Sequence, residues 1–84
     1  MNKKEVYEEL KRDPRNVRFE SLCQAAGLFG FRFRRGKGSH RIYLKDGVRE
    51  MLNLQSVKGM AKPYQVRQFL KVVERYKLLE EEDV

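Results

Sequence analysis

Two stretches of the chain carry apolar residues at the i, i+3, i+4 and i+7 spacing of an amphipathic helix. The first set is Phe19, Leu22, Cys23 and Ala26, and the second is Val66, Phe69, Leu70 and Val73. A glycine, Gly27 or Gly30, ends the first helix, because glycine accepts the left-handed cap conformation without steric cost. Pro63 suits the first turn of the second helix, which should run to about residue 76 or 78. A shorter helix with little apolar face is predicted over residues 2–12.

Between the two apolar helices the pattern alternates every second residue, as in strands with one buried face. The predicted inward pairs are Phe31 and Phe33, Ile42 and Leu44, and Leu52 and Leu54. Residues 35–39 form the first turn, Asp46-Gly47 signals a hairpin before a third strand over 50–55, and residues 56–62 form a loop. The prediction is an α+β fold of helix, three-stranded antiparallel sheet and helix, with both helices on one sheet face and an extra N-terminal helix. The opposite, open face would carry Arg32, Arg34, Arg41, Tyr43, Asn53 and Gln55.

The length of 84 residues allows one domain, with its core over about residues 17–79, the helical extension 2–12 and an acidic tail 80–84. Nineteen Lys and Arg against twelve Asp and Glu give a net charge of +7. This balance favours an anionic partner, with nucleic acid first and an anionic membrane surface second. A single Cys and a single His exclude an intrachain disulfide and a zinc finger. We expect no metal, no cofactor, no membrane span and a cytoplasmic location.

The cations concentrate in two places. The first is a run of five without an acid between them: Arg32, Arg34, Arg35, Lys37 and Arg41. A polyanion would neutralise this run, and Gly36 and Gly38 leave backbone N–H groups free to approach phosphate; the alternative is a solvated basic hairpin. The second place is the start of the last helix, where Lys58 and Lys62 add charge to the positive end of the helix dipole. The element order, and these lysines, are similar to those of double-stranded RNA-binding domains.

Aromatic side chains divide by their predicted face. Tyr43, on the open sheet face, is the aromatic residue that could stack on a base. Tyr7, Tyr64 and Tyr76 are expected to close the edges of the core, and Cys23 is expected to be a small core residue.

His40 is the single histidine, and it follows Gly38 and Ser39 inside the basic run. RNA can be cleaved without a metal when a base takes the 2′-OH proton and an acid protonates the leaving 5′-oxygen. A histidine can do either task near neutral pH. Strand alternation puts His40 on the core side with Ile42, unless the strand begins after it. The alternative interpretation is a polar residue at a strand edge.

The order of motifs resembles the HicA toxins of bacterial type II toxin–antitoxin systems. The matching pieces are Gly30-Phe31, then Gly38-Ser39-His40-Arg41-Ile42-Tyr43, then a strand and a helix led by proline, and they cover roughly residues 19–78. The resemblance implies a double-stranded RNA-binding-domain-like fold and an mRNA interferase that arrests translation. It also implies that His40 is required for activity and that a HicB antitoxin covers it; Gly38 matches the preceding glycine.

Three features depart from that family. Arg41 stands where many HicA proteins have a second histidine, residues 54–59 lack a Pro-His or His-Gly segment, and helix 2–12 is an addition. The first hypothesis is a metal-independent endoribonuclease toxin with His40, Gly38 and Ser39 in its catalytic site. Its RNA-binding residues would be Arg34, Arg35, Lys37, Arg41, Tyr43, Lys58 and Lys62. The alternatives are a non-catalytic RNA-binding module of the double-stranded type and a protein-interaction domain with an acidic partner.

Overall fold

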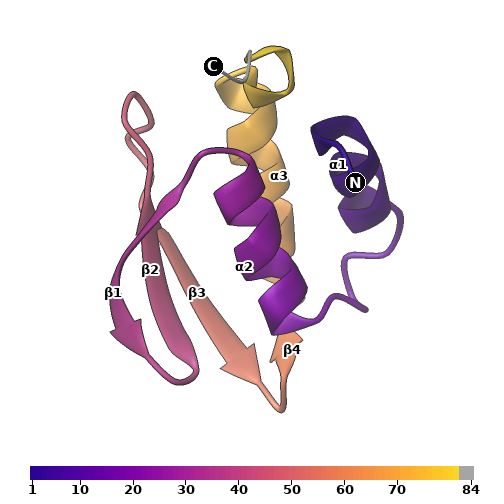
Figure 1. The fold of residues 1–84 in the computed structure, drawn as a ribbon. Coiled ribbons are helices and arrows are strands. Elements are labelled where there is room, and N and C mark those ends of the chain that lie inside the picture. The colour runs from indigo at the N-terminus through magenta and orange to yellow at the C-terminus, as the bar shows by residue number, and fades with distance from the viewer. Residues whose placement is uncertain (82–84) are drawn as a thin grey trace.

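The computed structural model describes residues 1–81, which form three α-helices, one short 3-10 helix and a four-stranded antiparallel sheet (Figure 1). The elements are α1 Lys3–Arg12, α2 Phe19–Leu28, β1 Arg32–Lys37, β2 His40–Leu44, β3 Leu52–Val57, β4 Met60–Ala61, α3 Pro63–Arg75 and η1 Leu78–Glu80. The sheet order is β1-β2-β3-β4. The α+β class and the N-terminal helix agree with the sequence, whereas the prediction of three strands is wrong.

The fourth strand arises from a tight turn inside the segment that was predicted as a loop. Lys58 and Gly59 both have positive φ angles, 53° and 81°, as a two-residue hairpin turn requires. The chain therefore reverses, and Val57 pairs with Met60. β4 is also hydrogen-bonded to the segment that precedes α2, since the Ala61 N–H donates to the Val17 carbonyl at 2.8 Å. Lysine is an unusual residue at positive φ, so composition alone does not indicate this turn.

The ends of the helices follow local rules. Helix α1 begins with a capping box, in which the side chains of Asn2 and Glu5 each accept a hydrogen bond from the other's backbone N–H. Helix α2 ends at Leu28, and the glycine that caps it is Gly30 rather than Gly27: Gly30 has φ of 93°, and the Phe31 N–H donates to the Ala26 carbonyl. These are the features of a Schellman cap.

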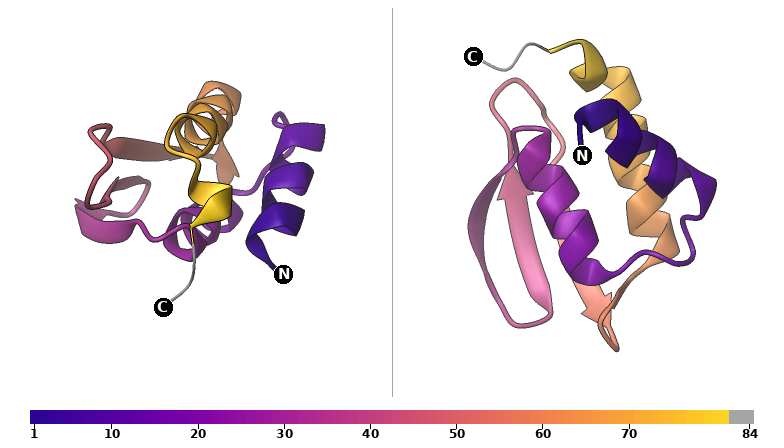
Figure 2. Two further views of the ribbon diagram at one scale, coloured as in Figure 1. Left: turned by 90° about the horizontal axis from the view of Figure 1, so that it is seen from above. Right: turned by 45° about the vertical axis from the view of Figure 1, so that its right-hand side comes forward.

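The core is one cluster built from the predicted stripes. Both helical stripes are buried, and so are Leu52 and Leu54. Phe69 lies at the centre, with its ring edge-on to Phe29 at 5.6 Å and to Phe31 at 6.1 Å between centroids. Helix α1 lies on the side of α2 and α3 that faces away from β1 and β2 (Figure 2). It adds Leu10 to the core, with its tyrosine packed against the edge.

Strand β2 is turned over relative to the prediction. Tyr43 pairs with Leu52 and Arg41 with Leu54, and directly opposite residues point to the same face of a sheet. Because both leucines are buried under the helices, Arg41 and Tyr43 take the helix side. The predicted inward pair, Ile42 and Leu44, and the predicted open-face location of Arg41 and Tyr43 are therefore wrong.

The two residues suit this buried position because each combines an apolar body with a polar end. Tyr43 is 8% exposed, and its ring lies edge-on to Phe33 at 5.9 Å. The Arg41 guanidinium carbon lies 5.0 Å from the centroid of the Phe19 ring and reaches Glu20 at the surface. A strand that reads Arg-Ile-Tyr-Leu can thus bury either alternate pair.

Strand β1 is longer and more exposed than predicted. It runs through residues 35–37, so the turn that was expected over 35–39 shortens to Gly38-Ser39. Every residue of β1 is exposed, including Phe33 at 55%. Phe33 does lie on the predicted helix side, because it pairs with the buried Tyr43, but it is not buried. The pairing slips between Phe33 and Arg35, a β-bulge that breaks the simple alternation. Phe31, the other predicted inward residue, is buried just before the strand.

The connection between β2 and β3 is longer than a hairpin turn. Asp46-Gly47 does form a turn, in which the Val48 N–H donates to the Lys45 carbonyl, but β3 begins at Leu52 and not at residue 50. Lys45 also forms an ion pair with Glu81 at 2.8 Å. The acidic tail therefore starts beside this connection; residues 82–84 of the predicted tail lie outside the described residues.

Candidate nucleic-acid interface

One end of the molecule gathers both two-residue turns and the first turns of α2 and α3 (Figure 1). The β1–β2 turn is Gly38-Ser39, and the β3–β4 turn is Lys58-Gly59. His40 begins β2 and Lys62 precedes α3, so both lie at this end. The two basic regions that are separate in the sequence therefore meet around His40 in the fold.

The open sheet face, on the side away from α2, carries His40. Cross-strand pairing puts Lys37 of β1 and Gln55 of β3 directly opposite it. The Gln55 Oε1 accepts a hydrogen bond from the Lys62 Nζ at 2.8 Å. Lys37, His40, Gln55 and Lys62 thus form a line across three strands to the start of α3, which we call the histidine row.

The imidazole of His40 is free at both nitrogens. Its side chain is exposed, and it makes no hydrogen bond or ion pair with any residue in the described range 1–81. The sequence analysis predicted that His40 and Ile42 lie on the same side of the strand, and they do, since both are on the open face. The predicted core side is wrong, because β2 is turned over. An imidazole in this position can reach a ligand that lies on the sheet.

Most of the predicted phosphate-binding cations also have free charges. Within residues 1–81, Arg34, Arg35, Lys37 and Lys58 form no ion pair. Arg35 lies opposite Ile42, on the open face, while Arg34 occupies the bulge of β1. Arg34, Arg35 and Lys37 therefore carry charge that no carboxylate of the described residues neutralises, whereas Arg32 of the same strand lies 3.7 Å from Asp46.

Arg41, another predicted RNA-binding residue, is already paired with a carboxylate. Its guanidinium makes two hydrogen bonds with the Glu20 carboxylate of α2, at 3.0 and 2.9 Å. This bidentate contact raises the pKa of Arg41 above its ordinary value. Arg41 lies on the helix side, so it does not share the open face with His40. The sequence analysis missed Glu20, since nothing in its spacing relates it to a residue of the second strand.

Tyr43 is buried and cannot receive a stacked base in this conformation. Its burial, and then the neighbouring Cys23 thiol, raise the pKa of the phenol. Cys23 is itself buried and reduced, in agreement with its predicted place in the core. The predicted stacking residue is therefore part of the interior packing between β2 and α2.

Gln65, in the first turn of α3, is a residue that the sequence analysis missed. It is 4% exposed, and its side-chain Oε1 accepts from the Gln55 N–H at 2.9 Å while its Nε2 donates to the Asn53 carbonyl at 2.6 Å. The amide thus completes the free edge of β3 in place of a neighbouring strand. It fixes the backbone of Gln55, which belongs to the histidine row. A single glutamine beside an apolar stripe gives no sequence signal for this role.

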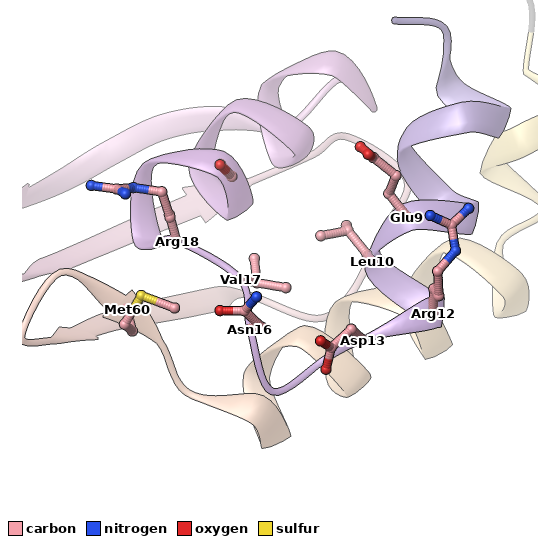
Figure 3. A pocket seen from close by; sticks show the side chains of 9 residues that line it. Glu9, Leu10, Arg12, Asp13, Asn16, Val17, Arg18 and Met60 are labelled. Atoms are coloured by element: carbon pink, nitrogen blue, oxygen red, sulfur yellow. The ribbon is translucent and has the colours of Figure 1, made fainter.

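One cavity lies away from the histidine row. It has a volume of about 620 Å³ and lies between the end of α1, the following connection and β4 (Figure 3). Leu10 and Val17 form its apolar part, and Asp13 and Arg18 are among its charged residues. No residue of the predicted site lines it. Lys37 and His40 are instead exposed on the sheet surface, a position suited to a polymer more than to a small molecule.

Among residues 1–81, no group of three His, Cys, Asp or Glu side chains could hold a metal ion. No helix in that range is long and apolar enough to cross a membrane. Comparison with protein-family models, with curated proteins and with solved structures finds no match to this chain. The resemblance to HicA toxins therefore rests on the sequence motifs alone.

Proposed function

We propose that this protein is a HicA-type endoribonuclease toxin that cleaves mRNA without a metal ion and uses His40 as its acid–base group. The observation that carries the proposal is the free, exposed imidazole of His40 between Lys37 and Gln55 on an open sheet face. The family resemblance supplies the same residue as the required histidine. The high net charge and the unpaired cations of the β1–β2 hairpin supply the attraction for RNA.

The proton abstraction and the charge stabilisation can be assigned to groups in or near the row. The imidazole of His40 would take the proton of a ribose 2′-OH as its oxygen attacks phosphorus, and the bond to the 5′-oxygen would break to leave a 2′,3′-cyclic phosphate. The 5′-oxygen leaves with a proton from a donor or from water. Lys37 and Arg35 would stabilise the negative charge on the phosphorus-bound oxygens. Gly38 and Ser39 form the turn that presents His40, and Lys58 and Lys62 would hold flanking phosphates.

The proposal includes a HicB-type antitoxin as the protein partner in the cytoplasm. The open sheet face supports this part of the proposal, because it carries the partly exposed apolar side chains Ile42 and Leu44 together with cations. A partner with apolar and acidic side chains would cover His40 and the cations at the same time.

A second candidate function is a non-catalytic RNA-binding module. It is favoured by one observation: Arg41, which stands where many HicA proteins have a second histidine, points to the helix side and does not share the open face with His40. Such a module would use phosphate contacts and would show a steep salt dependence. It would leave RNA intact.

Incubation of purified protein with labelled RNA in the presence of EDTA tests the proposal. We expect wild type to cut the RNA and His40→Ala to be about 100-fold slower or more, the usual contribution of an acid–base group. RNA binding should change little in His40→Ala, whereas Lys37→Ala should weaken binding as well. Lys71→Ala, an exposed cation on α3, is the matched control and should behave as wild type.

Two results would separate the candidates. If wild type binds RNA but cuts none, the non-catalytic module is correct and the nuclease proposal is wrong. If His40→Ala cuts as fast as wild type, cleavage does not depend on the row. Induction in a bacterial host then checks the toxin function. We expect growth arrest and RNA loss with wild type, and neither effect with His40→Ala.

A further inference from the structure

Tyr64 was expected to close the edge of the core, as Tyr7 and Tyr76 do, but it is 59% exposed. It is the second residue of α3, directly after Pro63. Its ring therefore offers a large apolar surface at the end of the molecule that carries His40. A single exposed apolar side chain is common on protein surfaces, so only the groups around the ring can assign it a role.

Two contacts place the ring beside the histidine row, one at its hydroxyl and one over its face. The Gln65 Nε2 lies 3.5 Å from the Tyr64 hydroxyl, and the same amide binds the edge of β3 at Asn53 and Gln55. The Lys62 Nζ lies 5.9 Å from the ring centroid and donates to Gln55. Tyr64 therefore continues the open sheet face beyond β3, next to a cation and in line with His40.

This pairing of a cation and an exposed ring matches one nucleotide of RNA. A nucleotide holds a phosphate and a flat base one sugar apart, and an aromatic ring next to a lysine can receive both. The base must be unpaired, because bases inside an A-form duplex are stacked on one another and their faces are closed to a side chain. The cations along β1 and the row provide the electrostatic attraction for the rest of the strand.

We propose that Tyr64 and Lys62 form a nucleotide subsite, which stacks an unpaired base on the Tyr64 ring and binds the adjoining phosphate on Lys62. The substrate is then single-stranded RNA or a loop, not a duplex. This inference rests on the proposed function, since it assigns the substrate class of the same face. It replaces Tyr43, which is buried, by a residue that the structure leaves accessible.

The absence of tryptophan from the chain provides a direct optical test. In a His40→Ala background, which keeps the RNA intact, Tyr64→Trp introduces one tryptophan at the subsite, and Leu79→Trp introduces one on η1 as the control. A single-stranded oligoribonucleotide should quench the fluorescence of the Tyr64→Trp protein as it binds and leave the control unchanged. Unquenched Tyr64→Trp at saturating RNA, with binding verified by anisotropy, would overturn the subsite.

Affinity measurements provide the second arm in the same background. Tyr64→Ala should bind the single strand about 5-fold or more weakly, the cost of losing one stacked base, while Tyr64→Phe should stay within about twofold. A duplex of the same sequence should lose no affinity with Tyr64→Ala. Phe33→Ala removes an equally exposed aromatic residue from the helix side and should bind as the background protein does.

The outcomes distinguish the subsite from the proposed function. If Tyr64→Ala binds the single strand normally while His40→Ala still abolishes cleavage, the subsite is wrong and the nuclease stands. If Tyr64→Ala weakens duplex as much as single-strand binding, the substrate class is wrong. If wild type neither binds nor cuts RNA, the proposed function fails and the subsite fails with it.

Discussion

Replacing Gln65 by leucine tests how α3 is attached to the sheet next to the histidine row. The change keeps the volume of the side chain but removes both hydrogen bonds to the edge of β3. The Gln55 N–H and the Asn53 carbonyl then lose their partners. A buried backbone group without a partner costs about 1–3 kcal/mol.

The structure sets the expected size of the effect. Gln55 is only partly buried and Asn53 is exposed, so water can reach part of this edge and the low end of that range applies to each group. The leucine also gains some apolar burial at a site where glutamine is 4% exposed. The two lost hydrogen bonds together cost about 2 kcal/mol and the burial of leucine offsets part of this, so we expect Gln65→Leu to lower the free energy of unfolding by about 1–2 kcal/mol.

Urea unfolding measures this change directly. The slope of the free energy against urea should be unchanged, and the midpoint should fall by about 1–2 M for a domain of this size. Gln68→Leu is the matched control, because Gln68 lies on the exposed side of the same helix and makes no hydrogen bond within residues 1–81. It should change stability by about 0.5 kcal/mol or less. Equal midpoints for the two variants would refute the role of Gln65 as the edge of β3.

Two further perturbations test the turn beside His40 and the contact at the opposite end. Gly36→Ala should destabilise the fold by about 2 kcal/mol or more, because Gly36 has φ of 136° and an added Cβ would lie 2.2 Å from the His40 carbonyl oxygen. Gly27→Ala is the control, because an added Cβ at this position in α2 meets open space, and it should stabilise the fold by about 0.5–1 kcal/mol in the same urea assay. An unchanged stability of Gly36→Ala would contradict the close contact between residue 36 and the His40 carbonyl. The Tyr76 hydroxyl, and then Arg75, lower the pKa of Glu50, so the native state binds this proton more weakly than the unfolded state does. The stability from Glu50 is fully present above its ordinary pKa and is lost as the pH falls from that value through the lowered pKa of the folded state. Glu50→Gln should therefore destabilise the fold at pH 7 and cost less near about pH 3, a difference that urea unfolding at both pH values would detect or exclude.

The helices could be predicted from the sequence because their signals are local. The stripes of Phe19 and Val66 recur at the helical period, and Gly30 supplies the left-handed cap that ends α2. A helix has one apolar side, so these residues face the core whatever else packs against it. The inward direction of Leu52 and Leu54 followed from strand alternation in the same way.

The face of β2 could not be predicted, because two alternate pairs compete for the interior. Ile42 is the more apolar residue, yet Tyr43 is buried, since its partner across the ladder is Leu52. That register depends on where β3 begins, after a connection whose length the Asp46-Gly47 signal does not define. One residue of difference in register exchanges the two faces of a strand.

The residues of the candidate site also differ in whether local sequence signals could identify them. His40, Lys37 and the cations of the β1–β2 hairpin could be identified from the sequence, because their charge and chemistry belong to single residues and to one short segment. The histidine row and the edge contact of Gln65, which also positions Tyr64, depend on contacts between residues that are 7 to 15 positions apart in the chain. They depend on strand register and on how α3 meets β3, which are contacts of the whole fold, so only the tertiary structure decides them.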